Sequence, residues 1–193
     1  MMLEDNGWIS QSNLTHFINT SSEFVLVAAF TATTTLASIP HHSQFQPVWS
    51  RVRYGSTYMS RQCQITRVTK SIPINSREGR YTTKNVSSME YIDEAGKKQI
   101  VVFTSGDPTY SHSHTERHMQ EFCKNNNIPN YRVLNIFTEF EPCTIPAEPA
   151  GCKRMLQKNF PYTNVTWSFP YGDTTESRRE GMQQLTEAAM HLH

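Results

Sequence analysis

Three short stretches decide how this chain is expected to fold: His114-Thr115-Glu116, Glu141-Pro142-Cys143 and Gly151-Cys152. Together they supply one imidazole, two thiols and a carboxylate two residues after the histidine. One imidazole and two thiolates can hold a zinc ion and leave its fourth position open to water, which is the donor set of a catalytic zinc site. The carboxylate of Glu116 is then expected beside the metal as a proton carrier and not as a ligand. The pattern therefore predicts a fold that brings His114, Cys143 and Cys152 together.

The residues before and after the histidine have the character of two strands and a helix. Residues 99–103 form a short apolar run rich in β-branched side chains, which is typical of a buried strand. Residues 87–92 precede it, and the turn-forming residues 93–96 between them predict a hairpin. Ser113 with Glu116 three residues later has the spacing of a capping box, so we expect a helix from there to about Lys124.

The two cysteines are expected at the ends of regular elements. Residues 131–140 predict a strand that ends at Glu141-Pro142-Cys143, and a helix that begins near Cys152 would place the second thiol at a helix N-terminus, where a thiolate is favoured. Residues 164–170 alternate like a strand, and residues 174–191 have an amphipathic pattern. This order predicts an α/β fold with helices on both faces of a mixed sheet and a site at the carboxyl ends of its strands. A fifth strand is either absent or supplied from upstream, and residues 64–70 are a candidate.

The combination of His-x-Glu, Pro-Cys and a second cysteine resembles the signature of the zinc nucleobase deaminases. Over residues 87–193 the chain is therefore similar to the cytidine/nucleotide deaminase superfamily. The resemblance implies a three-layer α-β-α sandwich around a mixed four- to five-stranded sheet. It also implies Zn²⁺ held by His114, Cys143 and Cys152, and hydrolytic deamination of a nucleobase with Glu116 as the catalytic proton carrier.

The spacing of the cysteines departs from that signature. The superfamily usually places them two residues apart, whereas residues 144–151 lie between them here. Pro146 and Pro149 exclude a helix in that segment, so we expect it to loop out and return Cys152 to the metal. Gly151 can take turn geometry before the helix. The alternative is that Cys152 is not a ligand.

Other arrangements of the same side chains are also possible. His112 could replace His114 as a ligand, although no glutamate then follows at the required offset. A structural zinc site would need a fourth protein ligand, from His112 or Cys123. A disulfide between Cys143 and Cys152 would leave the His-x-Glu pair without a role.

Several residues are candidates for substrate binding. The resemblance implies that the backbone near Thr115 and Pro142 contacts the edge of the base. Aromatic rings could stack on the base or pack in the core: Tyr110, Trp167 and Phe169, with Phe140 as a further possibility. Basic and tyrosine residues interleave between residues 51 and 84 and include Arg77 and Arg80, which indicates either a groove for a nucleic-acid strand or a solvated surface.

The length, net charge and apolar segments of the chain bear on its domain organisation and partners. The chain has 193 residues and a formal net charge of +1, so it lacks the overall basic field of many nucleic-acid-binding proteins. Residues 1–50 are expected to be an N-terminal extension or the tail of an upstream region, and residues 51–193 a deaminase domain. The apolar residues 24–39 are too short and too rich in threonine for a membrane span, and no basic stretch precedes them as in a signal peptide, so no membrane partner is expected.

Residues 138–143, the wide cysteine spacing and the terminal helix resemble the deaminase domains of bacterial polymorphic toxins. This resemblance implies conversion of cytosine to uracil in a nucleic acid, single-stranded DNA above all, and a cognate immunity protein. It implies a secreted effector that acts in a target-cell cytoplasm, and a cytoplasmic protein is the alternative. Other enzymatic alternatives are a tRNA adenosine deaminase or a free nucleoside or nucleotide deaminase. An inert, zinc-stabilised binding module would not need Glu116.

Overall fold

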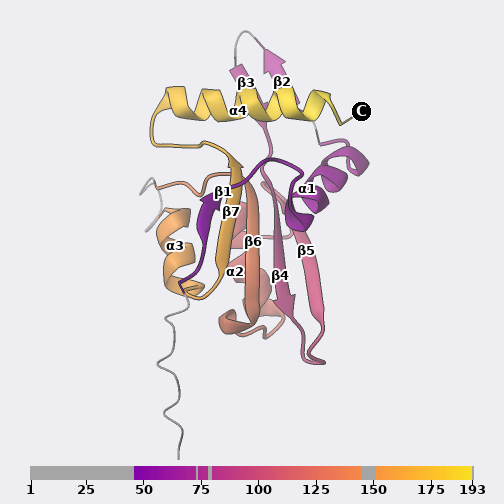
Figure 1. Cartoon of the computed structure of the whole chain (residues 1–193), viewed down its shortest axis with the longest axis vertical. Coiled ribbons are helices and arrows are strands. Elements are labelled where there is room, and N and C mark those ends of the chain that lie inside the picture. Colours follow the sequence, from indigo (N-terminus) through magenta and orange to yellow (C-terminus); the bar gives the residue numbers. More distant parts are fainter. Residues whose placement is uncertain (1–45, 73, 78–79, 145–150, 193) are drawn as a thin grey trace, which may run out of the picture. The chain divides into compact units, whose positions relative to one another are not determined.

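The computed structural model describes residues 46–72, 74–77, 80–144 and 151–192, and for residues 74–77 and 80–83 it describes the backbone alone. These residues contain a five-stranded sheet in the spatial order β1-β7-β6-β4-β5 (Figure 1). Its strands are β1 (Trp49–Arg51), β4 (Val86–Ile92), β5 (Lys98–Thr104), β6 (Val133–Phe140) and β7 (Asn164–Phe169).

The directions of the strands bring several strand ends together at one end of this sheet. Strands β1, β7 and β6 are parallel, and β4 is antiparallel to both β6 and β5. The carboxyl ends of β1, β5, β6 and β7 therefore lie together with the start of β4, at the upper end of the sheet in Figure 1. Binding sites of α/β folds form at such an end. The mixed sheet confirms the predicted fold class.

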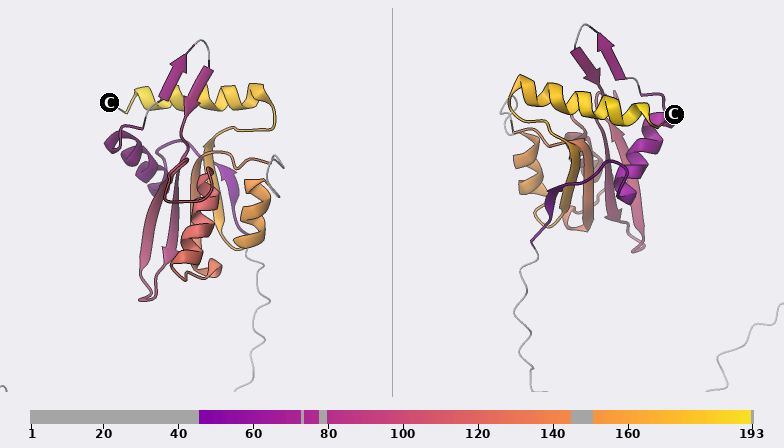
Figure 2. Two further views of the ribbon diagram at one scale, coloured as in Figure 1. Left: turned by 180° about the vertical axis from the view of Figure 1, so that it is seen from behind. Right: turned by 45° about the horizontal axis from the view of Figure 1, so that its top comes forward.

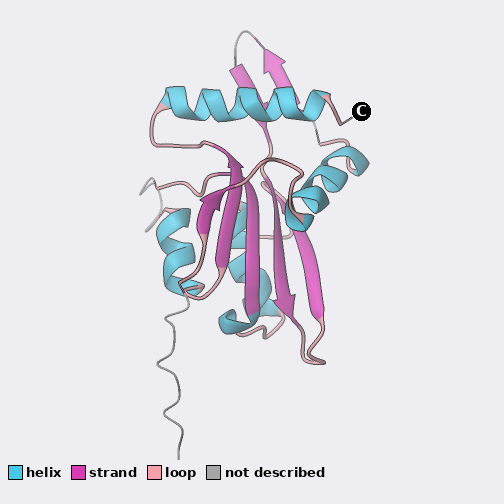
Figure 3. Cartoon of the chain, in the orientation of Figure 1, coloured by secondary structure: helices cyan, strands magenta, loops and turns pink. Residues whose placement is uncertain are grey.

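Helices cover both faces of the sheet (Figure 3). Helix α1 (Tyr58–Thr69) packs on one face, where Phe137 and Val86 meet its buried side chains. Helices α2 (Thr115–Asn125) and α3 (Cys152–Asn159) pack on the other face, the α2–α3 face. The core of that face contains Met89, Phe103, Met119, Cys123, Val133, Ile136, Met155, Leu156, Phe160 and Val165.

Helix α4 (Thr175–Met190) crosses the upper end of the sheet and does not cover a face (Figure 2). Its Leu185 packs against Phe140 and Phe169, at the ends of β6 and β7. A Cβ atom at Gly181 would lie 1.8 Å from the carbonyl oxygen of Pro170, so a side chain there would push the helix away. Glycine in mid-helix costs stability relative to alanine, and here it allows close packing on the sheet.

A small hairpin lies against α4 (Figure 2). It consists of β2 (Ile74–Arg77) and the antiparallel β3 (Arg80–Thr83). Arg77 and Arg80, the predicted strand-binding residues, pair across this hairpin, but their side chains lie outside the described part of the chain. None of the described helices has the length and apolar character that a membrane crossing requires.

The fifth strand comes from a different segment than the sequence suggests. The prediction of a strand at residues 64–70 is wrong, because these residues lie in α1 and the turn after it. The side chain of Thr57 caps that helix, and its buried side chains recur at helical spacing. The fifth strand is β1, which pairs with β7 and begins at Trp49, before the expected domain boundary at residue 51.

Two element boundaries also shift. Residues 131 and 132 belong to a 3₁₀ turn (Asn130–Arg132), and the strand begins after it at Val133. Helix α2 is capped by His114 in an extended conformation, one residue later than the Ser113 cap that the sequence indicates. His114 is therefore the N-cap residue, and its ring makes no capping hydrogen bond to the helix.

A buried ion pair connects the elements near the upper end of the sheet. The carboxylate of Glu139, on β6, is fully buried and accepts hydrogen bonds from Arg67 Nε (2.8 Å) and Arg67 Nη2. It also accepts from the backbone N–H of Val86 (2.8 Å) and from the hydroxyl of Tyr54 (2.5 Å). Burial and the neighbouring Glu139 raise the pKa of Tyr54, so its phenol stays protonated and donates. These bonds join α1, β4 and β6.

Replacing Arg67 should therefore destabilise the fold strongly. Arg67→Met leaves the Glu139 carboxylate buried without its cation, which typically costs about 3–5 kcal/mol. Urea unfolding followed by circular dichroism measures the loss. Arg61→Met is the matched control, because Arg61 is exposed on the same helix and its replacement should change stability by less than about 0.5 kcal/mol. Equal effects of the two substitutions would contradict a stabilising role for the ion pair.

Candidate metal centre and active site

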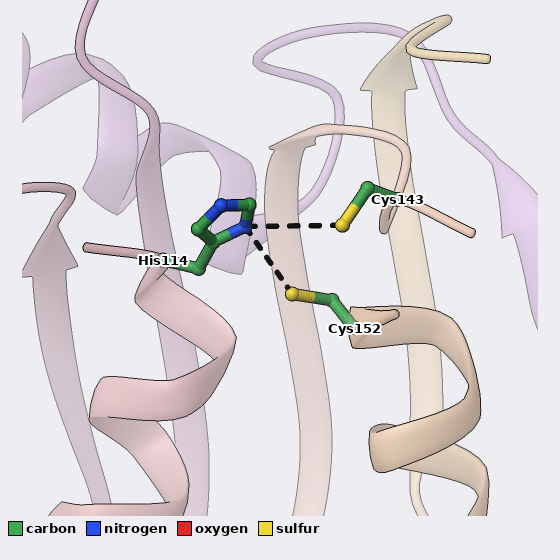
Figure 4. Close-up of side chains that lie close together, drawn as sticks. All are labelled: His114, Cys143 and Cys152. Carbon is green, nitrogen blue, oxygen red and sulfur yellow. Dashed lines mark hydrogen bonds between the residues drawn. The ribbon is translucent and has the colours of Figure 1, made fainter. Parts of the chain in front are cut away.

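His114, Cys143 and Cys152 converge at the upper end of the sheet (Figure 4). His114 caps α2, Cys143 follows the end of β6, and Cys152 is the first residue of α3. Their ligand atoms all lie within 4.8 Å of one another. The Nδ1 atom of His114 is 3.4 Å from the Cys152 sulfur and 3.8 Å from the Cys143 sulfur. Three elements distant in sequence thus present the donor set that the sequence predicts.

These separations fit a tetrahedral zinc ion. Typical Zn–N and Zn–S bond lengths and a tetrahedral angle give a nitrogen-to-sulfur separation of about 3.6 Å. The observed separations of 3.4 and 3.8 Å lie on either side of that value. One imidazole and two thiols are also the right chemistry for this metal, and three protein donors leave a position for water. The side chains therefore could hold zinc, and Glu116 is not one of the donors.

Gly151 explains how the cysteines meet despite their spacing. A Cβ atom at Gly151 would lie 2.7 Å from the carbonyl carbon of Thr144 and 2.8 Å from the carbonyl oxygen of Cys143. The backbone N–H of Lys153 donates to the same oxygen of Cys143 at 3.0 Å. The chain therefore returns to Cys143 before α3 begins. Glycine is not required here for turn geometry, because any residue can adopt its φ of −51°. It is required because a side chain would collide with the backbone of Cys143 and Thr144. Pro146 and Pro149 lie outside the described residues.

The two thiols share a proton unequally. A hydrogen bond from the Cys152 thiol, followed by one from His114, lowers the pKa of Cys143 to about 4 against the opposing effect of burial. The same hydrogen bond and burial raise the pKa of Cys152. The first proton therefore leaves the pair easily, and the second leaves only when a cation compensates the added charge. Thiol pairs that bind a metal ion lose their protons in this way.

Glu116 lies in the first turn of α2, beside the three donors, and only 4% of the residue is exposed. Burial raises the pKa of its carboxyl above the ordinary value. The hydroxyl of Thr115 donates to Glu116 Oε2 at 3.3 Å. One carboxylate oxygen is thus held by the protein, while the residue lines the cavity described below.

Thr115 belongs to a buried network of hydroxyl groups. The side-chain amide of Asn85 donates to Thr115 Oγ1 at 3.0 Å and to Thr138 Oγ1 at 2.9 Å. The hydroxyls of Ser87 and Thr115 are 2.7 Å apart. The Asn85 Nδ2 group can only donate, so the Thr115 and Thr138 hydroxyls accept from it, and the Thr115 hydroxyl can donate its own proton to Glu116. Sequence reasoning missed Asn85, Ser87 and Thr138, although polar residues facing each other across two buried strands, Ser87 and Thr138, were a detectable signal.

His114, Cys143 and Glu116 line a cavity of about 220 Å³. Phe140, Tyr171 and Met182 form its apolar wall, and the last two come from the β7–α4 connection and from α4. Its other lining residues are Asn85, Ser105, Ser113, His114, Thr115, Glu116, Glu141 and Cys143. The cavity can therefore hold a flat ring against an apolar wall, with proton donors and acceptors opposite.

The predicted substrate-binding residues are distributed around this cavity. Thr115 lines it, and Pro142 is buried next to it, between Glu141 and Cys143. Tyr110 stacks on the ring of the buried His118, with centroids 4.4 Å apart, and does not line the cavity. Trp167 does not line it either, and Phe169 packs against Phe140 behind the wall. Sequence reasoning missed Tyr171 and Met182, because no local pattern predicts where α4 crosses the sheet.

The alternative ligands and pairings lie elsewhere. The exposed His112 is not part of the donor cluster, and its carbonyl oxygen is 2.6 Å from His118 Nε2. Cys123 lies in the core, with its sulfur 3.9 Å from that of Met89. Cys143 and Cys152 are free thiols and not a disulfide.

The thiol pair makes a prediction for metal-free protein. Because the pKa of Cys143 is lowered to about 4, its thiolate is fully formed well below neutral pH. Its alkylation rate should stay nearly constant between about pH 6 and about pH 8. The alkylation rate of an ordinary thiol rises about tenfold for each pH unit in that range. Mass spectrometry after iodoacetamide treatment of chelator-treated protein measures the rate.

Cys152→Ala removes the first donor to Cys143 and should restore an ordinary pH dependence. The buried Cys63 and Cys123 should remain unlabelled in both proteins. A tenfold rise per pH unit at Cys143 in the unsubstituted protein would contradict the shared proton.

Comparison with known proteins gives one family. A model described as Xanthomonas-like deaminase matches residues 82–188, which is more than half of the chain and includes His114, Glu116, Cys143 and Cys152. No curated protein and no solved structure matches the chain. With the predicted fold and a His-Cys-Cys donor cluster beside a buried glutamate at the end of its sheet, the chain belongs to the Xanthomonas-like deaminase family.

Proposed function

We propose that this deaminase is a zinc-dependent hydrolase that converts cytosine to uracil in single-stranded DNA or another nucleic acid. The observation that carries the proposal is one arrangement: three zinc-type donors within 4.8 Å of one another, with the Glu116 carboxyl beside them in a cavity of about 220 Å³. His114, Cys143 and Cys152 would hold the metal. When bound there, zinc supplies Lewis acidity and brings the pKa of water toward neutrality.

Glu116 carries out the proton transfers in this proposal. Its carboxylate takes a proton from the attacking water and delivers it to the ring nitrogen of cytosine. Hydroxide adds to the ring carbon that bears the amine. Glu116 then takes the remaining proton of the added hydroxyl and passes it to the amine, and ammonia leaves as the carbonyl of uracil forms. A proton carrier works best with a pKa near the working pH, so the raised pKa of Glu116 suits this role.

The size of the cavity favours a base that belongs to a larger molecule. Sites for drug-sized ligands occupy about 300–1,000 Å³. A cavity of about 220 Å³ has room for one ring and leaves sugar and phosphate groups outside. Taking a base out of a duplex costs a few kcal/mol, whereas taking it out of a single strand costs little. A single strand is therefore the favoured substrate. Arg77 and Arg80, on the hairpin beside α4, remain proposed contacts to the strand.

The biological setting is proposed from resemblance. The resemblance to polymorphic-toxin deaminases supports DNA as the polymer, a role as the toxin domain of a secreted effector that acts in a target-cell cytoplasm, and a cognate immunity protein as partner. Such a partner would protect the producing cell by covering the cavity.

Activity on four substrates tests the proposal. Zinc-loaded protein should form uracil in single-stranded DNA with a higher kcat/KM than in duplex DNA, RNA or free cytidine, measured by mass spectrometry of the digested product. Glu116→Gln should lower kcat by more than about 10²-fold and retain its zinc, because the residue carries protons and holds no metal. Free cytidine as the best substrate would favour a nucleoside deaminase, and hypoxanthine formed from adenosine in tRNA would favour a tRNA adenosine deaminase. If no product forms from any of these substrates, the result would favour an inert binding module.

Metal analysis tests the ligand set. One zinc per chain should bind to the wild type, and Cys152→Ala should weaken its affinity at least about tenfold, because a thiolate ligand is lost. Cys123→Ala is the matched control, since its sulfur lies in the core and should leave zinc binding unchanged. Unchanged zinc affinity in Cys152→Ala would remove this residue from the site. Zinc retained by a His114→Ala, Cys143→Ser double variant would overturn the whole ligand assignment.

A further inference from the structure

A second cavity lies on the α1 side of the sheet, beneath the C-terminal half of α4. Its volume is about 670 Å³, three times that of the cavity beside Glu116. It is lined by Arg51, Val52, Arg53, Tyr54, Gln64, Ser168, Phe169, Ala188, His191 and Leu192. Two arginines and a histidine are therefore among the residues that line this space, and none of the lining residues carries a carboxylate.

The two arginines differ in how they are held. Arg51 donates from Nε to the carbonyl oxygen of Ser168 and from Nη2 to Gln184 Oε1, both at 2.7 Å, so its guanidinium has a fixed orientation. Arg53 is exposed, and its side chain has no hydrogen-bond or ion-pair partner within the described part of the chain. One cation is thus already oriented and the other is available for a ligand.

Ser168 adds a further group without a partner. The residue is 3% exposed, and its hydroxyl has no hydrogen-bond partner among the described residues. Because Val165 lies in the core of the α2–α3 face and side chains alternate along β7, Ser168 belongs to the opposite face, the side of α1 and this cavity. Buried hydroxyls normally have a partner, so this one indicates an acceptor or donor that the described residues do not supply.

The chemistry of this lining fits a phosphate group. Guanidinium groups bind phosphate with two parallel hydrogen bonds, and a hydroxyl donor can serve another oxygen. The absence of a carboxylate from the lining favours an anion over a cation. The volume also exceeds what one phosphate requires, which leaves room for the sugar or base attached to it.

The two cavities are close enough for one strand to reach both. Phe140 lines the first and Phe169 the second, and their ring centroids are 6.3 Å apart. On α4, Met182 lines the first and Ala188 the second. Six helical residues span about 9 Å. Stacked nucleotides of one strand advance about 3.4 Å each, so this distance corresponds to about three nucleotides.

We propose that this second cavity binds a phosphodiester group of the same strand whose cytosine enters the cavity beside Glu116. The inference rests on the proposed function, because it requires a polymeric substrate. It makes Arg53 a determinant of substrate class: a strand that reaches both cavities gains a contact that a free nucleoside does not have.

Salt-dependent binding tests the second cavity separately from catalysis. Fluorescence anisotropy with a labelled oligothymidylate of about 12 nucleotides measures affinity without turnover, because the strand contains no cytosine. Each phosphate contact to a single strand contributes about 0.7 to the slope of log affinity against log salt. Arg53→Gln should reduce the slope by about that amount and weaken binding severalfold at low salt.

Lys97→Gln is the matched control. It removes the same charge from an exposed residue at the β4–β5 turn, at the opposite end of the sheet, and should leave the slope unchanged. An unchanged slope in Arg53→Gln, an equal reduction in both variants, or no binding by the wild type would overturn the proposal.

Inorganic phosphate distinguishes a free anion from a strand. Thermal stabilisation of the wild type by phosphate, lost in Arg53→Gln while the oligonucleotide slope stays unchanged, would assign the cavity to free phosphate and overturn the strand contact. The outcome is independent of the deaminase assay. A reduced slope without uracil formation would retain the strand contact and reject the proposed reaction, whereas uracil formation with an unchanged slope would do the reverse.

Discussion

The upper end of the sheet depends on the carboxylate of Glu139. It is fully buried and receives hydrogen bonds from Tyr54, from two nitrogens of Arg67 and from the backbone of Val86. A carboxylate in this position would be several kcal/mol less favourable without its donors. The network therefore fixes how α1 and β4 meet β6. Because β6 leads directly to Cys143, it also fixes where the first thiol stands.

The next residue back along the strand begins a second network on the opposite face. Side chains alternate along a strand, so Thr138 points away from the ion pair and toward α2. There it shares the amide of Asn85 with Thr115, whose hydroxyl reaches Glu116. One strand thus supports two networks at this end of the molecule: a charged one that holds the sheet and α1 together, and a neutral one that positions the Glu116 carboxyl. The hydroxyls on the second face satisfy one another without placing another charge beside the metal donors.

The predictable parts of the structure are those written in local patterns. Residues 99–103 and 164–169 follow strand character, and the His-x-Glu and Pro-Cys motifs carry their ligands within a few residues of an element end. The missed parts depend on distant partners. Strand β1 has only three residues, too few to show an alternating hydrophobic pattern. Helix α1 exposes the apolar Ile65, which obscures the apolar stripe of the helix. Arg67 and Glu139 are separated by 72 positions, so no local spacing reveals that they pair. The cavity wall from α4 depends on how closely Gly181 lets that helix approach Pro170.

The wide separation of the cysteines follows the same distinction between local and distant constraints. Loop-closure entropy rises by only about 0.6 kcal/mol per doubling of loop length, so lengthening the connection from two residues to eight costs about 1.2 kcal/mol. The hydrogen bond from Lys153 to the carbonyl of Cys143 can offset much of this cost. What the site cannot accept is a bulkier residue at Gly151, where the two ends of the connection touch. The spacing between the ligands is therefore a weak constraint on this centre, and the contact between the ends of the loop is a strong one. A motif defined by spacing alone would overlook such a site, whereas one that requires glycine directly before the second cysteine would retain it.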